Sequence, residues 1–186
     1  RVRCRTVTCL QHAGVYNSAM RQVLILRHGK SDWPDGVADH DRPLKPRGRR
    51  DSARMGQWLL ARDLAPDAVL TSTARRARST ARRVCDALGL SHAVIHENAS
   101  LYHAGPDALT ARLNGLSEDT DRVLLVGHNP GLEIWVGAVE RRPVRLPTCA
   151  LAVIEAADDW PGLTPQRCRL TQLIRPRELE PADADG

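Results

Sequence analysis

The sequence contains no phenylalanine and only two tyrosines among its 186 residues. Four tryptophans supply most of the aromatic bulk, so the core has to be built largely from Leu, Val, Ala and Ile. The chain is long enough for one domain with a core of its own. No apolar run approaches the roughly 20 residues that a transmembrane helix needs, which argues against a membrane protein.

The cysteine pattern shows no metal or redox spacing. The five cysteines are odd in number, and no two of them form a C-x-x-C pair. They are Cys4, Cys9, Cys85, Cys149 and Cys168. We interpret them as free thiols in a reducing compartment, which predicts a cytoplasmic protein.

Lysine is almost absent, with two lysines against 25 arginines. The net charge of +5 and the pI of about 9.3 are typical of nucleic-acid-binding proteins. However, the arginines are spread along the chain, as expected from a GC-rich bacterial genome. We therefore interpret the charge as general surface charge and consider a nucleic-acid partner the weaker hypothesis.

The chain divides into a leader, one domain and a tail. Residues 1–19 contain no acidic residue, no periodicity and no apolar core of a signal peptide, so they are predicted to be a disordered leader. An organelle-targeting segment is the alternative. The domain is predicted over residues 20–175, beginning at Met20, and residues 176–186 are a predicted polar tail.

Strand and helix patterns alternate along the domain. Apolar runs predict strands at 22–27, 67–72, 92–97, 121–128, 149–156 and 168–174. Amphipathic patterns predict helices at 47–63, 74–89, 105–116 and 131–140. This alternation predicts an α/β fold, a three-layer sandwich whose mainly parallel central sheet is flanked by helices.

Basic residues follow three of the predicted strands. The first strand ends in Arg27-His28-Gly29, and the second runs into residues 72–77. The fourth strand ends in Gly127-His128-Asn129-Pro130. Arg75, Arg78 and Arg82 share one face of a helix and are interpreted as solvated, whereas Arg76 points elsewhere from the first turn. Because functional sites form at the carboxyl ends of parallel strands, four side chains are expected to converge there: Arg27, His28, Arg76 and His128.

These residue types favour phosphate chemistry. Arginine forks bind phosphate oxygens, a helix N-terminus favours an anion, and a neutral imidazole can attack phosphorus. Ser31, in the loop of about 20 residues after His28, is predicted to touch the substrate, and a loop-capping role is the alternative. In the same loop, Asp39 and Arg42 are expected to pair in a structural role. The other histidines, His92, His96 and His103, match no role and are interpreted as surface or satisfied polar residues.

The motifs resemble the histidine phosphatase superfamily, which includes the cofactor-dependent phosphoglycerate mutases. Closer still, "LRHGKSDW", "SLYHA" and "LLVGHNPGLE" resemble its small phosphohistidine phosphatase branch, and the resemblance spans about residues 23–173. That branch more often has Ala at the positions of Gly29 and Ser52.

The resemblance implies a phosphoglycerate mutase-like fold and a metal-independent phosphatase without a cofactor. His28 would be the nucleophile that becomes phosphorylated. Arg27, Arg76 and His128 would bind the phosphoryl group and stabilise charge during its transfer.

Larger members of the family protonate the leaving oxygen with a carboxylic acid, and this chain departs from that pattern. Glu97 is near the expected position but is equally well interpreted as a solvated carboxylate at a strand end. A missing acid favours phosphohistidine on a protein as the substrate, because an alkoxide leaving group needs acid catalysis. Small phosphomonoester metabolites are the alternative substrates, and a non-catalytic phosphate-binding or nucleic-acid-binding module is the remote one.

Overall fold

The computed structural model describes residues 21–157 and 159–179. The predicted leader at 1–19 and the end of the predicted tail at 180–186 lie outside the described residues. The start of the predicted tail forms a short 3-10 helix, Pro176–Glu178, in which Pro176 is buried. Within the described ranges, no helix has both the length and the apolar character needed to cross a bilayer.

The core is built around one mixed six-stranded sheet with the order β3-β2-β4-β1-β5-β6. Four strands pair in parallel, β5 pairs antiparallel with β1, and β6 pairs antiparallel with β5, which confirms the mainly parallel sheet. The strand bounds are β1 Arg21–Arg27, β2 Ala68–Ser72, β3 Ile95–Asn98, β4 Arg122–Gly127, β5 Leu151–Ala156 and β6 Cys168–Ile174.

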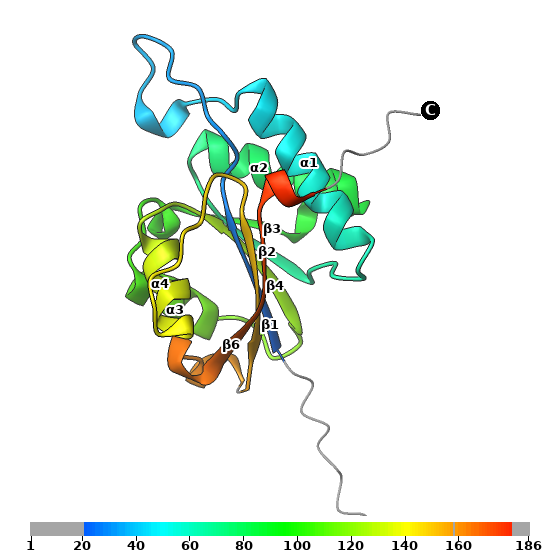
Figure 1. Cartoon of the computed structure of the whole chain (residues 1–186), viewed down its shortest axis with the longest axis vertical. Helices are drawn as coiled ribbons and strands as arrows, with labels where there is room; N and C mark the ends of the chain where they lie inside the picture. Colours follow the sequence, from blue (N-terminus) through cyan, green and yellow to red (C-terminus); the bar gives the residue numbers. More distant parts are fainter. Residues whose placement is uncertain (1–20, 158, 180–186) are drawn as a thin grey trace, which may run out of the picture.

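Helices cover both faces of this sheet (Figure 1). One face carries α1 Pro46–Leu60 and α2 Arg75–Leu88, and the other carries α3 Pro106–Asn114 and α4 Gly131–Glu140. Side chains alternate along β1, so Leu24 and Leu26 pack toward α1 and α2 while Val23 and Ile25 join the opposite cluster. Burial on both sides explains the uninterrupted apolar run and confirms the three-layer sandwich.

The predicted strand at 92–97 is only partly correct. His92–Val94 forms a 3-10 helix, and the strand β3 begins at Ile95. The cause is local, because the Ser91 hydroxyl accepts a hydrogen bond from the backbone N–H of Ala93 and turns the chain before pairing starts. The long loop after β1 contains a 3-10 helix at Asp39–Asp41.

The register of the sheet places the two motif histidines side by side. β1 and β4 are parallel neighbours, and Arg27 is the partner of Gly127 in the last matched pair. His28 and His128 each follow one member of that pair, so both leave the sheet at the same carboxyl edge. The predicted convergence therefore follows directly from strand pairing.

The two positions at which the chain departs from the phosphohistidine phosphatase pattern lie against each other. A Cβ atom on Gly29 would lie 2.8 Å from the carbonyl oxygen of Gly48 and 3.0 Å from Oγ of Ser52. Ser52 Oγ donates a hydrogen bond to that same carbonyl at 2.7 Å. The missing side chain at position 29 therefore leaves the room that the Ser52 hydroxyl occupies.

We expect Gly29→Ala to destabilise the protein by about 1–3 kcal/mol, the usual cost of overpacking. Ser52→Ala in the same chain should recover part of that loss, because it removes one of the two close contacts. Urea unfolding of the two single variants and the double variant measures the coupling. Gly105→Ala is the control, since nothing lies within 4 Å of its added Cβ. Equal stability of Gly29→Ala and Gly105→Ala would contradict the packing argument.

Candidate active site

His28 is held in one tautomer at the end of β1. Its Nδ1 lies 2.8 Å from the carbonyl oxygen of Gly29, which can only accept a hydrogen bond, so Nδ1 carries the hydrogen. The lone pair is then on Nε2, which accepts a hydrogen bond from Nε of Arg76 at 3.3 Å. The side chain is buried, and its unprotonated nitrogen faces a cation.

Arg76 points into the fold from the first turn of α2, as predicted, and is only 2% exposed. Besides His28, its guanidinium contacts Asp39, with Nη2 and Oδ2 2.9 Å apart. Arg78 lies on the more exposed side of the same helix, where it pairs with Glu97 at 3.4 Å. Glu97 also pairs with Arg82 and does not line the cavity at the strand ends.

His128 approaches His28, with 5.0 Å between the ring centroids. Its Nε2 lies 2.9 Å from Oγ of Ser72, and Nδ1 is buried without a hydrogen-bond partner in the described structure. Ser72 Oγ already accepts the N–H of Ala74, so its own hydrogen is available for Nε2 of His128. In that arrangement Nδ1 carries a hydrogen and can donate it to an anion.

Arg27 completes the predicted set. Its Nη1 donates to the carbonyl oxygen of Leu146 at 2.9 Å, and its Nε is buried without a partner in the described structure. All four predicted residues and Ser31 line one cavity of about 210 Å³. The full lining is Arg27, His28, Lys30, Ser31, Asp39, Arg42, Arg76, His103, His128, Asn129 and Thr148.

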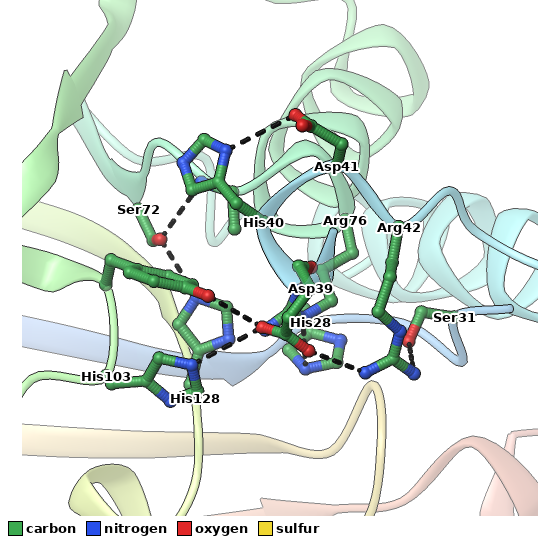
Figure 2. A network of polar contacts seen from close by, with 12 residues as sticks. His28, Ser31, Asp39, His40, Asp41, Arg42, Ser72, Arg76, His103 and His128 are labelled. Carbon is green, nitrogen blue, oxygen red and sulfur yellow. Dashed lines mark hydrogen bonds and ion pairs between the residues drawn. The ribbon is translucent and has the colours of Figure 1, made fainter. Parts of the chain in front are cut away.

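Asp39 connects the cationic residues of this cavity (Figure 2). Its carboxylate accepts hydrogen bonds from Tyr102 Oη at 2.7 Å and from Arg42 Nη1 at 2.9 Å, in addition to Arg76. Arg42 in turn donates to Ser31 Oγ at 2.9 Å. The expected Asp39–Arg42 pair is therefore present, but it is part of the site rather than of the loop alone.

The charge state of Asp39 follows from these contacts. Burial alone would raise the pKa of Asp39, but hydrogen bonds from Tyr102, Arg42 and Arg76 hold that pKa well below its usual value. The group is therefore an anion placed against Arg76, and it has no proton to give.

The interpretation of His103 as a surface residue was incomplete. Its side chain is 54% exposed, yet it lines the cavity, and its Nε2 lies 3.4 Å from Oδ2 of Asp39. Figure 2 shows it beside His128. A signal was present in the sequence, since Tyr102 and His103 follow β3 at the same sheet edge as the other motifs. His92 and His96 lie outside the cavity.

Both motif histidines are neutral at pH 7. Burial, assisted by the nearby positive charges of Arg76 and Arg27, lowers the pKa of His28 to about 4. Burial together with His28 and Arg76 lowers the pKa of His128 to about 3. Among the described residues, no group of three or more His, Cys, Asp or Glu side chains is arranged to hold a metal ion.

Comparison with known proteins identifies the family. Residues 23–101 match the histidine phosphatase superfamily (branch 1). The phosphohistidine phosphatase SixA of Escherichia coli is 34% identical over 112 residues, which cover 59% of this chain and 68% of that protein. The chain belongs to the histidine phosphatase superfamily. This confirms the resemblance and identifies the protein as a phosphatase.

Two further proteins are similar to this histidine phosphatase over most of its chain. An uncharacterized protein of Mycobacterium tuberculosis is 37% identical over 167 residues, which cover 82% of this chain and 100% of that one. The solved structure of a protein histidine phosphatase SixA complexed with tungstate has a TM-score of 0.75 and 27% identity, covering 86% of this chain and 99% of the other. The fold is therefore that of SixA-like histidine phosphatases.

The lowered histidine pKa values predict a loss of stability in mild acid. Histidines of the unfolded chain titrate near 6.5, whereas His28 and His128 stay neutral down to about 4 and about 3. Below pH 6.5 the unfolded chain therefore binds more protons, and stability falls as the pH falls. We expect each histidine to cost about 1 kcal/mol between pH 7 and 5.5.

Urea unfolding at pH 7 and pH 5.5 measures this loss. His128→Asn is the matched variant, because it removes one of the two titrating groups, and it should show a smaller decrease. An identical pH dependence in the two proteins would show that His128 is not held neutral.

Proposed function

We propose that this phosphatase removes phosphate from phosphohistidine on a protein, without a metal, through a phosphorylated His28. One observation carries the proposal: the neutral Nε2 of His28 faces the guanidinium of Arg76 inside a cavity lined by further cations. A nucleophile and a phosphate-binding arginine are thus already in hydrogen-bond contact. The phosphoryl group would enter between them.

The reaction needs two transfers. In the first, Nε2 of His28 attacks phosphorus and the bond from phosphorus to the substrate nitrogen breaks, releasing the substrate's imidazole. In the second, water attacks the phosphorylated His28, which frees inorganic phosphate and restores the imidazole. Nδ1–H stays bonded to the Gly29 carbonyl oxygen in both steps and keeps the ring oriented.

Charge in both transfers would be stabilised by groups that are already in place. Arg27 and Arg76 supply guanidinium hydrogens, and the unpartnered Nδ1 of His128 supplies a further donor. Before the substrate binds, the carboxylate of Asp39 pairs with the guanidinium of Arg76. The incoming phosphoryl oxygens would take over contacts of Arg76 that Asp39 holds in the free protein.

Two lines support phosphohistidine as the substrate. The relatives named SixA are phosphohistidine phosphatases, and their similarity extends over most of the domain. In addition, the imidazole of phosphohistidine can leave as a neutral molecule when its other nitrogen is protonated, so it depends little on an acid in the site. Glu97, the acid considered from the sequence, does not line the cavity.

Small phosphomonoesters are the second candidate, favoured by the position of His103. A protonated His103 at the cavity mouth would form an ion pair with Asp39 and could give its proton to a leaving alkoxide. A phosphorylated histidine-carrier protein assayed beside sugar and glycerate phosphates separates the two candidates. A kcat/KM about 100-fold higher on the metabolites than on the phosphorylated carrier protein would overturn the preferred substrate. One general acid contributes a factor of that size, so the result would indicate that the site protonates an alkoxide leaving group.

The covalent intermediate is directly testable. The protein incubated with an aryl phosphate and quenched should carry acid-labile, base-stable phosphate, and a chelator should not reduce turnover. His28→Ala should lose the label and at least about 1000-fold of the activity, as expected for a nucleophile. Arg50→Ala, a change of an exposed residue outside the cavity, should keep both. Full turnover by the His28→Ala variant would refute the proposal.

The role of His103 is tested by changing the leaving group. His103→Gln should lower kcat/KM on an alkyl phosphate by about 100-fold but on phosphohistidine by less than about tenfold, because only the alkoxide needs a proton. Glu97→Gln should stay near wild type on both substrates. Equal losses on the two substrates in His103→Gln would mean that His103 positions Asp39 and does not donate the proton.

A further inference from the structure

A second, larger cavity adjoins the catalytic one at the same edge of the sheet. Its volume is about 650 Å³. Its walls come from the end of β1, the start of α1, α4, the segment before β5 and the segment after β6. They consist of Arg27, Arg47, Glu133, Arg145, Leu146, Pro147, Thr148, Arg175, Pro176 and Arg177, a set that we call the basic groove.

The basic groove carries an excess of positive charge. Five arginines line it against the single carboxylate of Glu133, which accepts a hydrogen bond from the backbone N–H of Leu146 at 2.8 Å. Asp51 and Glu178 pair with some of these arginines, yet the cations still outnumber the acids. Arg145 is exposed and forms no ion pair with any residue of the described chain.

The groove is continuous with the catalytic cavity. Arg27 and Thr148 line both cavities. A substrate whose phosphoryl group lies against His28 would therefore extend past Arg27 into the groove. A small metabolite would leave most of the groove unused, because the catalytic cavity is only about a third of its size.

We propose that the basic groove binds an acidic segment of the phosphoprotein substrate, next to its phosphorylated residue. This inference rests on the proposed function and narrows its substrate to proteins with Asp or Glu near the phosphorylated residue. Pro147 is exposed and offers an aliphatic contact between the arginines, which suits a peptide. The lining contains no aromatic residue on which nucleic-acid bases stack, so a nucleic acid fits it less well.

The test compares two phosphohistidine peptides, one with Asp and Glu around the phosphorylated residue and one with Asn and Gln. The measured quantities are the ratio of their kcat/KM values and the binding of the acidic, unphosphorylated peptide by fluorescence anisotropy. The variant is Arg145→Glu/Arg177→Glu. Its control is Arg50→Glu/Arg62→Glu, which makes the same change of net charge at exposed arginines outside the groove.

We expect the acidic peptide to be preferred by at least about tenfold, and this preference to be lost in the groove variant and retained in the control. High salt should weaken the preference, as for exposed charges. An equal preference in the two variants, or tighter binding of single-stranded RNA than of the acidic peptide, would overturn the inference. Groove-dependent binding without hydrolysis of either peptide would instead refute the proposed function and leave the groove assignment intact.

Discussion

The buried guanidinium of Arg76 organises the whole carboxyl edge of the sheet. A buried cation is costly unless it is paired and hydrogen-bonded, and here the partners are the lone pair of His28 and the carboxylate of Asp39. Asp39 reaches Arg76 only because the long loop after β1 folds back over the strand ends. The loop is then fixed by Tyr102, which lies outside it, and by Arg42 within it. The requirement to satisfy one cation thus determines the shape of the cavity mouth.

In the free protein, the carboxylate of Asp39 pairs with Arg76 in the way that we propose for the phosphoryl group of the substrate. The carboxylate of Asp39 is an anion that forms charge-assisted hydrogen bonds of the kind a phosphoryl group would form. In the proposed mechanism, exchanging it for phosphate would keep Arg76 paired throughout, so binding would not have to overcome the cost of a bare buried cation. The two neutral histidines fit this scheme, because protonating either would add a positive charge beside Arg27 and Arg76.

Local pattern and strand order together were enough to predict that Arg27, His28, Arg76 and His128 converge, but not what surrounds them. Arg27 ends a strand, and His28 and His128 directly follow strands. Arg76 lies in the first turn of a helix that follows a third strand, so parallel pairing brings the four together. Asp39, Tyr102 and His103 come from loops whose course depends on contacts between distant segments. The amphipathic pattern predicted over 47–63 is only partly matched, although Leu59 is buried. Leu60 is 55% exposed, while Ser52 is buried because its face meets the backbone near Gly29 instead of an apolar layer.

Arg27 lines both cavities, so the groove proposed to select the substrate and the cavity proposed to react with it share one residue. Its Nη1 donates a hydrogen bond to the Leu146 carbonyl oxygen, so the segment that forms one wall of the basic groove also positions an arginine of the catalytic cavity proposed to bind phosphate. Glu133 holds the same segment through the N–H of Leu146. A ligand that moved this segment would move Arg27 with it. Under the proposed function, recognition of the substrate protein would therefore depend on the outer arginines, since a change of Arg27 would also disturb phosphate binding.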